Sequence, residues 1–593
     1  MPFVGRDFLM IDQHLNDKFS FLTSRVFKLV ILLLIPLSVV TYLYGLDSQY
    51  VLNNPDENPY MYIARLTAGT QHWLPLQSEV DHLKNTKPPL LFWQGIASTN
   101  FAQDWNLFNL RLPSFIYTFL TALFLFFSVK RFSKNTQTGL LAALVWLSFI
   151  GTYRFGRPYL TEPPEIFWLI LPFFALLYWG KRAFESKWLF PLFAAISLGL
   201  ALLYKSFFYV MPVGLALTLW YGCWRDWRLF FSFKHDAIKL ILVGVVSLAI
   251  FSLWFIFDPV PEAVWREFVL GENLGKIEPK SGSYLQHLLW GGRSIWSVMF
   301  STIASAGLLS FVLLTTLWQC WRKRETMLFE EKLLWLLILA FFLAFMLPSH
   351  RSGRYMLPVM PAYAALMALY WQRLPLWGFR IALILQFAIL AALYWLSWNL
   401  QGSQWLINSV WQYPFWHWVI LLMGLAVVLL GIIKTSPAKV SALAGCFLCY
   451  CALTSSLAPL DGSLGHYSAA AIQQVQNQDL WIPCSSQSKK EKDRLLLPGV
   501  RLHGYPAEDA KALAFLAERY PLYVAYVPQG VVPELCNGCQ MIGGRVHMLT
   551  HQRSKEIKKI LLGKIGTHLF INEYLITGPI WVNTPAFLYE DVC

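Results

Sequence analysis

Charged residues are scarce in this chain. Only 14% of its 593 residues are charged, while 56% are hydrophobic and 16% are aromatic. Soluble proteins usually carry about 25% charged residues. The deficit, together with repeated long apolar runs, excludes an ordinary soluble protein and indicates that lipid is the main solvent. Internal repeats and low-complexity segments are also missing from the sequence.

A basic surface of the kind that binds nucleic acid is missing too, although the net charge is +14. The Lys and Arg residues lie in short loops between apolar runs, and they form no basic face with interleaved aromatic side chains. Trp and Tyr instead gather near the ends of the runs, as is typical of side chains at a membrane interface. We therefore expect membrane lipids, and no nucleic acid, as partners.

We expect no cleavable signal peptide either. The first apolar run begins near residue 29, behind a charged and amphipathic lead, and no small-residue cleavage site follows it. We expect this run to remain in the protein as a signal anchor.

Apolar runs of about 20 residues, the length that crosses the hydrocarbon of a bilayer, recur along the first three quarters of the chain. They predict a polytopic α-helical membrane protein with about 13 transmembrane helices. The predicted spans lie near 29–46, 111–129, 139–153, 164–180, 188–204, 207–223, 239–257, 295–318, 333–347, 356–371, 380–398, 415–433 and 439–457.

Loop charges predict the orientation. With a cytoplasmic N-terminus, the cytoplasmic loops would hold roughly 22 Lys and Arg residues and the opposite loops roughly 12 or 13, which is the bias that the positive-inside rule describes. An odd number of spans then places residues 458–593 outside. We predict a transmembrane domain at 1–457, with a large external loop at 47–110, and an external C-terminal domain at 458–593.

The C-terminal residues have a different character, with a strand-like run at Leu522–Val527 and a helix-like run at 507–520. This mixture predicts a small soluble α/β domain. It also contains Cys484, Cys536, Cys539 and Cys593, which predict one or two disulfides in an external domain.

The spacing of Cys536 and Cys539 is also that of half a zinc site or of a redox motif. Together with Cys484 and Cys593 the pair makes an even number of cysteines in an external domain, so we favour a disulfide over a zinc site. The other five of the nine cysteines lie in or beside apolar runs and are expected to be inert.

Carboxylates and cations gather in the loops that the predicted topology places on the external face. Charges beside membrane spans are costly, so their placement is informative. Arg and Lys hold phosphate oxygens through charge-assisted hydrogen bonds, and a carboxylate accepts a proton from an attacking hydroxyl or holds a sugar ring. We interpret the loops as a site for an anionic, lipid-linked substrate. The residues concerned are Asp56, Glu57, Lys87, Arg154, Arg157, Glu162, Glu165, Lys205, Arg266, Glu267, Glu272, Asn273, Lys276, Lys280, His350, Arg351 and Arg354.

Each element of this site has a purely structural alternative. Asp56 could cap a helix at 57–68, because Asp is favoured at that position. Lys87 could extend its ammonium to a lipid headgroup. Glu162 and Glu165 could serve only the dipole of a helix that begins there.

Five motifs in order resemble one family. They are Asp56-Glu57-xx-Tyr60, Lys87-Pro-Pro-Leu-xx-Trp93, Leu110-Arg-Leu-Pro-Ser114, Glu162-Pro-Pro-Glu-Ile-Phe-Trp and Arg354-Tyr355-xx-Leu-Pro-xx-Pro361. This order resembles the bacterial aminoarabinose lipid A transferases and their relatives among the protein O-mannosyltransferases. These are polytopic glycosyltransferases of the GT-C class, which use a sugar linked to polyprenyl phosphate. The resemblance covers about residues 29–372 by motif order, and the later helices by architecture alone.

The resemblance implies roles for single residues. Asp56 resembles the catalytic aspartate of the first loop, and Glu162 stands where relatives carry a second aspartate. Lys87 resembles a lysine near the donor phosphate, and Tyr355 a tyrosine that contacts the phosphate.

The remaining substrate-binding candidates come from the same motifs and loops. Glu57 and Tyr60 share the motif of the catalytic aspartate, and Arg354 precedes the phosphate-contacting tyrosine. Asn273 and Lys276 resemble a loop that closes over the donor. We add Arg157, one of the cations in the predicted external loops, to the substrate-binding candidates.

Two positions depart from the family pattern. Glu162 replaces an aspartate, which moves its carboxylate about one methylene further out. Thr86 stands where the aminoarabinose transferases have a glutamate that helps to hold a divalent cation. A divalent cation is thus the one cofactor that the resemblance suggests, and its ligands in this chain stay unassigned.

The resemblance implies a membrane glycosyltransferase that moves a monosaccharide from a polyprenyl-phosphate donor to a lipid, such as lipid A or lipopolysaccharide, or to another envelope acceptor, with inversion. It also implies a bacterial inner membrane, with the site and the C-terminal domain on the periplasmic face. The alternatives are a transporter or flippase for a polyprenyl-linked saccharide, a protein O-glycosyltransferase, and a GT-C polymerase or ligase that joins longer glycans.

Overall fold

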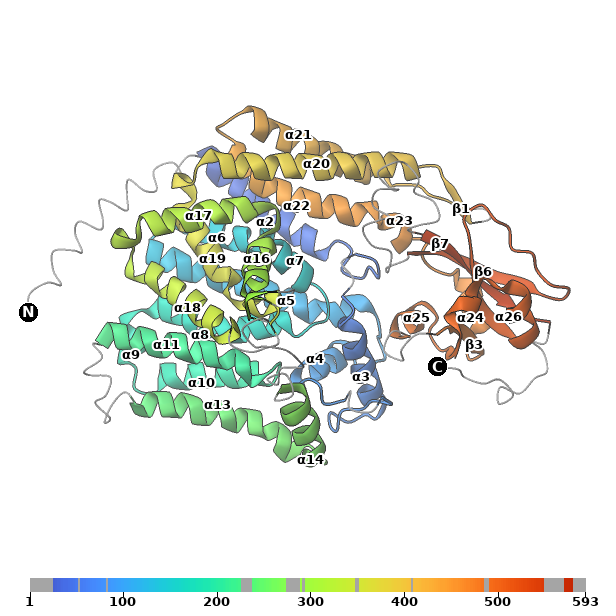
Figure 1. Ribbon diagram of the computed structural model, residues 1–593, viewed down its shortest axis with the longest axis horizontal. Coiled ribbons are helices and arrows are strands. Elements are labelled where there is room, and N and C mark those ends of the chain that lie inside the picture. The colour runs from blue at the N-terminus through green and yellow to red at the C-terminus, as the bar shows by residue number, and fades with distance from the viewer. Residues whose placement is uncertain are drawn as a thin grey trace, which may run out of the picture.

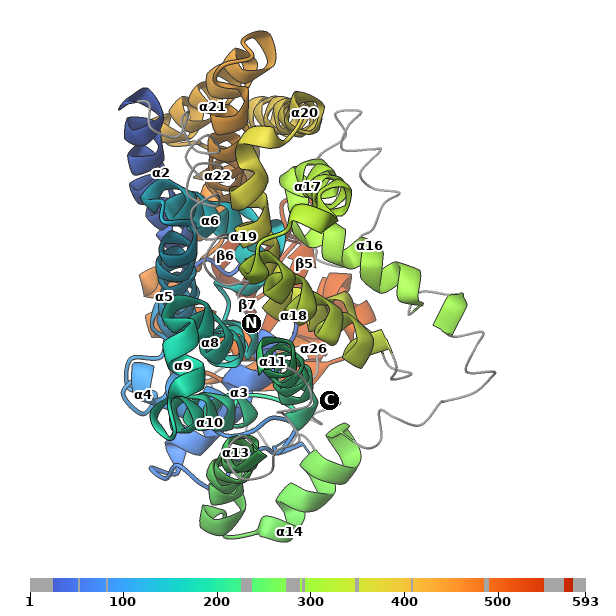
Figure 2. The same ribbon diagram turned by 90° about the vertical axis from the view of Figure 1, so that its left-hand side faces the viewer.

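The computed structural model describes residues 25–51, 54–80, 84–225, 237–273, 288–290, 294–346, 351–406, 409–484, 490–548 and 570–579. Most of these residues are helical, and the long helices run side by side with a β-sheet at one end of the bundle (Figure 1). Figure 2 shows many of the same helices nearly end-on. The main helices are α2 (Arg25–Leu43), α5 (Leu107–Ser133), α6 (Thr136–Ser148), α8 (Glu162–Trp179), α10 (Leu189–Leu202), α11 (Val210–Arg225), α13 (Ala237–Phe257), α16 (Ile295–Ser305), α17 (Ser310–Arg322), α18 (Phe329–Met346), α19 (Met360–Tyr370), α20 (Leu376–Leu400), α21 (Phe415–Ile433) and α22 (Ala438–Ser456).

Helix α5 illustrates how the sequence sets helix ends. The Asn106 side chain accepts a hydrogen bond from the Asn109 N–H and caps the first turn. Lys130 and Arg131 lie in the last turn, where cations interact favourably with the helix dipole. The helix ends at Lys134, which adopts a left-handed conformation.

Several helices are compatible with a membrane. Among the described residues, five are long and apolar enough to cross it, or six if one bent pair counts as a single span. Shorter apolar helices accompany them at Leu29–Leu43, Thr136–Ser148, Leu189–Leu202 and Val210–Trp220. Large apolar side chains of α13 such as Ile241, Val245 and Ile256 are exposed, which fits a helix solvated by lipid.

The predicted span at 295–318 is broken. Helices α16 and α17 meet at a bend of 103°. Gly307 lies at the break with a φ of +61°, and a Cβ atom there would lie 2.7 Å from Cβ of Ile150. A glycine that closes a helix in the left-handed region and packs against a neighbour explains why an apolar run does not stay one straight helix.

A five-stranded mixed sheet follows the helices. Its strands are β3 (Asp479–Pro483), β4 (Arg501–Tyr505), β5 (Leu522–Val527), β6 (Gln540–Met548) and β7 (Phe570–Thr577), in the order β4-β3-β5-β7-β6. Strand β3 pairs in parallel with β4 and β5, while β7 pairs antiparallel with β5 and β6.

The C-terminal elements match the sequence interpretation in part. The strand-like run is β5, as predicted. The helix-like run at 507–520 divides into a 3-10 turn at Ala507–Lys511 and α26 at Leu513–Arg519. Two further short helices are α24 (Ala469–Val475) and α25 (Glu491–Leu496).

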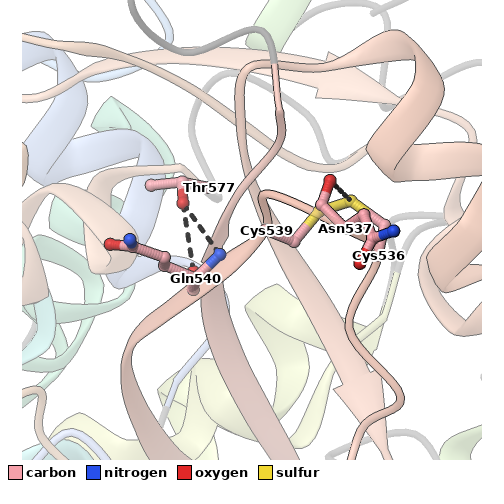
Figure 3. The surroundings of a disulfide bond; sticks show 5 residues. All are labelled: Cys536, Asn537, Cys539, Gln540 and Thr577. Atoms are coloured by element: carbon pink, nitrogen blue, oxygen red, sulfur yellow. Dashed lines mark hydrogen bonds between the residues drawn. A yellow bond between two sulfur atoms is a disulfide. The ribbon is translucent and has the colours of Figure 1, made fainter.

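The described cysteines of this region are disulfide-bonded. Cys536 and Cys539 are bonded to each other (Figure 3), so this pair is not half a zinc site. Cys484 is also disulfide-bonded. Cys320, Cys446, Cys449 and Cys451 are buried free thiols, as expected of packing residues.

Three segments between the helices build one end of the bundle. The loop at 47–110 contains α3 (Glu57–Gly69) and α4 (Leu90–Ser98). A π-helical segment, η3 (Trp265–Asn273), follows α13, and a 3-10 segment, η7 (Gly353–Val359), leads into α19.

Candidate active site

A cavity of about 440 Å³ lies where these segments meet the starts of α8 and α11. It brings together residues from parts of the chain that are up to about 300 positions apart. The lining residues are Asp56, Tyr60, Thr86, Lys87, Thr161, Glu162, Lys205, Ser206, Phe208, Tyr209, Phe268, Glu272, Asn273, Phe345, Ser352, Arg354 and Tyr355.

The guanidinium of Arg354 joins the two carboxylates that the sequence singled out. Its Nη1 donates to Asp56, and its Nη2 lies 2.5 Å from Oε1 of Glu162. The guanidinium also lies 4.9 Å from the ring centre of Phe155. The planar fork of an arginine suits this arrangement, because it can hold two acceptors at once while one face stacks on an aromatic ring.

Asp56 does not cap α3. It precedes the helix, but its side chain makes no capping hydrogen bond and contacts Arg354 instead. The Asp56 side chain is 45% exposed, whereas that of Glu162 is 2% exposed. Asp56 is therefore the carboxylate that a second molecule in the cavity can reach.

Glu162 is held in its ionised form. Burial alone would raise the pKa of Glu162, but the ammonium of Lys205 and the guanidinium of Arg354 outweigh it and lower the pKa to about 2. The carboxylate lies at the start of α8, just before the predicted span at 164–180. Two prolines follow it, in the first turn of a helix where proline is tolerated.

Lys205 links Glu162 to Glu165 one helical turn further on. Its Nζ lies 3.3 Å from Oε1 of Glu162 and 2.9 Å from Oε2 of Glu165. The lysine stood among the external charges in the sequence but was not chosen as a site residue. Its position between two apolar runs was the signal, because an ionisable residue there is costly unless it has a function or partners.

A second ion pair closes another side of the cavity. The Nζ of Lys87 lies 2.5 Å from Oε1 of Glu272 in η3. The neighbouring Asn273 accepts a hydrogen bond of 2.5 Å from the Ser206 hydroxyl and donates one of 2.7 Å to the carbonyl of Phe268. The end of η3 is thus tied to both the first loop and the start of α11.

Two tyrosines complete the polar lining. Burial, together with the carboxylates of Glu162 and Asp56, raises the pKa of Tyr60, so its phenol stays protonated. Tyr355 packs edge-on against Tyr209, with ring centres 5.7 Å apart.

Glu57 and Arg157 do not line this cavity. Glu57 is fully buried, where it accepts two hydrogen bonds of 2.7 Å from Arg111 and one from the N–H of Tyr159. Arg157 donates to the carbonyls of Tyr42 and Tyr44 and to a tyrosine hydroxyl. Lys276, like His350 and Lys280, lies outside the described residues.

The lining residues do not fit a divalent cation. Asp56 and Glu162 both contact a guanidinium, and Thr86 supplies no carboxylate. Across the part of the chain that the structure describes, no group of three or more His, Cys, Asp or Glu side chains converges in the way a metal would need.

Comparisons with known proteins agree with the resemblance seen in the motifs. Residues 26–258 match the family model "Dolichyl-phosphate-mannose-protein mannosyltransferase". An undecaprenyl phosphate-alpha-4-amino-4-deoxy-L-arabinose arabinosyl transferase of Proteus mirabilis is 26% identical over 360 residues, which are 59% of this chain and 60% of that protein. One of Pseudomonas aeruginosa is 28% identical over 328 residues, or 53% and 54%. The matches thus span little more than half the length of these relatives.

The fold resembles that of a solved protein over nearly its whole length. The crystal structure of ArnT from Cupriavidus metallidurans bound to undecaprenyl phosphate superposes with a TM-score of 0.55 and 14% identity, covering 92% of this chain and 97% of that one. The apo structure of the same protein gives a TM-score of 0.57, with 94% and 99% covered.

Proposed function

We propose that this chain, which by its relatives and its fold is an ArnT-like protein of the GT-C class, is a membrane glycosyltransferase. It would take a monosaccharide from a polyprenyl-phosphate donor and pass it to a lipid acceptor such as lipid A. The observation that carries the proposal is the cavity in which Arg354 joins Asp56 and Glu162, with Lys87 and Lys205 in the same lining. Such a site offers cations for a phosphate and carboxylates for a sugar.

In the proposed reaction, an acceptor hydroxyl attacks the anomeric carbon of the donor sugar. The bond from that carbon to the phosphate oxygen breaks, and polyprenyl phosphate leaves with the electron pair. A bond to the acceptor oxygen forms, and the hydroxyl proton passes to Asp56. A single displacement of this kind inverts the anomeric configuration.

The surroundings of each carboxylate support this division of roles. Asp56 is the more exposed of the two, as a group that receives a proton from an incoming acceptor must be. Glu162 stays ionised because of its two cations, so its role is to orient Arg354 and to stabilise the positive charge that develops on the sugar ring.

The cations are assigned to the phosphate. Lys87, Lys205 and Arg354 lie in the cavity wall, and all three are paired with carboxylates in the protein alone. A donor phosphate would exchange part of this pairing for charge-assisted hydrogen bonds to its own oxygens. We assign Tyr60, Asn273 and Tyr355 to binding of the donor, and Lys276 on the basis of its motif.

The finer architecture belongs to the same proposal. We propose about 13 spans within a transmembrane domain at 1–457, and a soluble α/β domain at 458–593 on the periplasmic face. The N-terminus would be cytoplasmic and the membrane would be a bacterial inner membrane. The lipid acceptor and the donor would then meet in the cavity at the periplasmic face.

A protein acceptor is the second candidate, because the family model that matches residues 26–258 describes protein mannosyltransferases. The same cavity would serve either acceptor, since only the attacking hydroxyl differs.

A transfer assay tests the proposal. Purified protein in detergent is incubated with a panel of polyprenyl-phosphate sugars and, in separate samples, a membrane lipid extract or Ser- and Thr-containing peptides, and the products are read by mass spectrometry. A sugar-sized mass gain on a lipid supports the proposal, and a gain on a peptide supports the second candidate. Donor binding without any transfer contradicts both candidates. That result favours a transporter, which would bind the donor but could not transport it in detergent, where no gradient exists.

A further inference from the structure

Helix α3 links the cavity to the C-terminal region. Asp56 immediately precedes the helix and Tyr60 lies in its first turn, and both line the cavity. Arg65 lies on the same helix, further along. In Figure 1, α25 occupies the space between α3 and the five-stranded sheet, and the two short helices pack against each other.

The contact between the two helices is a buried ion pair with two parallel hydrogen bonds. The Nη2 of Arg65 lies 2.8 Å from Oε1 of Glu491, and its Nε lies 2.9 Å from Oε2. The Glu491 side chain is completely buried, whereas that of Arg65 is 27% exposed. A paired fork of this kind fixes both distance and orientation. Removing one partner of a buried pair leaves an uncompensated charge behind.

Arg494 provides an internal comparison for this pair. It contacts the same carboxylate oxygen at 2.6 Å, but it belongs to α25 itself, three residues further on. Its hydrogen bond to Glu491 lies within α25, whereas the hydrogen bonds of Arg65 join α25 to α3. Substituting Arg65 therefore tests the contact between α3 and α25, whereas substituting Arg494 tests a contact within α25.

The other end of α3 is fixed by the helix bundle. Glu57, in the first turn, is held by Arg111 of α5 through two hydrogen bonds of 2.7 Å. Helix α3 is thus attached to the bundle at its start and to the C-terminal region further along. Because a short helix moves as a rigid unit, the placement of Asp56 and Tyr60 depends on both attachments.

We propose that Glu491 is a positioning residue, through which the C-terminal region holds α3 so that Asp56 and Tyr60 face the donor. This inference rests on the proposed function, because it assigns the C-terminal region a part in the same reaction. The role is indirect, since Glu491 does not line the cavity. It acts through Arg65 on the geometry of the reacting groups, where a displacement of about 1 Å can cost about 10²-fold in rate.

The test compares Glu491→Gln, Arg65→Met and the double variant with Arg494→Gln as the matched control, all in the full chain. We expect kcat for transfer to fall about 10-fold or more in both single variants, while KM for the donor changes less than about 3-fold. The double variant should be no slower than the slower single variant, because both remove one interaction. Arg494→Gln should lower kcat less than Glu491→Gln or Arg65→Met does, because Arg65 still joins Glu491 to α3.

A second measurement does not depend on transfer. Amide hydrogen exchange of residues 57–69 should be faster in Glu491→Gln and Arg65→Met than in wild type and Arg494→Gln. If Glu491→Gln does not fold, Arg65→Met answers the same question from the more exposed partner, and Arg65→Lys should restore part of the rate.

Folded variants with wild-type kcat and wild-type exchange of residues 57–69 would overturn the inference. So would a lower yield of folded protein with an unchanged kcat per folded molecule, because that result describes a merely structural pair. If wild type itself transfers no sugar, the proposed function fails. The exchange measurement then still decides whether α25 holds α3.

Discussion

Arg354 is the side chain on which both carboxylates of the cavity converge. Its fork places one nitrogen at Asp56 and another at Glu162, while its face lies over Phe155. A lysine has the same charge but only one nitrogen, so it cannot hold both carboxylates and stack in the same way. The arginine therefore sets the distance between the two groups that we assign to the reaction.

We predict that Arg354→Lys lowers kcat/KM for transfer by about 10²-fold or more, because the charge remains but the geometry is lost. The measurement is the initial rate of transfer against donor concentration. Arg501→Lys is the matched control, because Arg501 makes a similar two-bond pair with Asp479 on the sheet, with both distances 2.8 Å. Equal rates in wild type and Arg354→Lys would remove Arg354 from the mechanism.

The sequence identified most of the cavity but not the direction of each side chain. Asp56 and Glu57 are adjacent carboxylates, and successive residues of a helix point about 100° apart, so one faces the cavity while the other is buried against Arg111. Arg157 likewise faces backbone carbonyls rather than the cavity. Such choices depend on how segments distant in the chain pack against each other, as α3 does with α5 and Arg157 with the end of α2, and no local pattern in the sequence contains that information.

Lys205 was overlooked for a related reason. Its partners, Glu162 and Glu165, lie about 40 positions earlier in the chain, at the start of α8. The sequence showed a lysine between two apolar runs, but only the packing of α8 beside α10 brings it to the cavity.

At the scale of elements, a bend within an apolar run was harder to predict than the position of the run. The expected spans at 239–257, 380–398 and 415–433 coincide closely with α13, α20 and α21. The run at 295–318 is equally apolar, yet it bends sharply between α16 and α17. A hydropathy value is an average over many residues. The bend, in contrast, depends on one residue, Gly307, and on the side chain of Ile150 that packs against it.

We predict that Gly307→Ala destabilises the protein by about 1–3 kcal/mol, because alanine is strained at a φ of +61° and its Cβ would collide with Ile150. The measurement is the thermal unfolding midpoint in detergent. Gly214→Ala is the matched control, since Gly214 lies within α11 and nothing lies within 4 Å of a Cβ atom added there. We expect that change to be neutral or to stabilise the helix by up to about 1 kcal/mol. A Gly307→Ala midpoint equal to that of Gly214→Ala would show that the bend does not depend on this glycine.

At the scale of the whole molecule, the proposed topology assigns the cavity and the sheet to the same face. Helix α3, whose residue Tyr60 lines the cavity, packs against α25, and α25 lies beside the sheet at one end of the helix bundle (Figure 1). The short 3-10 turn η6 (Arg324–Thr326), between α17 and α18, belongs to a loop that the charge bias assigns to the cytoplasm.

We predict that an exposed cysteine at Ser463→Cys reacts with a membrane-impermeant maleimide in intact spheroplasts. One at Thr326→Cys should react only after the membrane is permeabilised. Both positions are exposed in the structure, so accessibility in detergent is the control. Labelling of Thr326→Cys alone in intact spheroplasts would invert the topology and place the cavity on the cytoplasmic side.

The most direct test of the central claim is the rate of sugar transfer by Asp56→Asn, measured beside its affinity for the donor in the same preparation. The amide keeps the size of the side chain but cannot accept the proton of the attacking hydroxyl, so transfer should fall by about 10²- to 10⁴-fold. Donor binding should persist, because Lys87 and Lys205 remain. Asp479→Asn, the same change on the sheet, should transfer at the wild-type rate. A well-folded Asp56→Asn that transfers sugar as fast as wild type would contradict the assignment of Asp56 as the catalytic carboxylate.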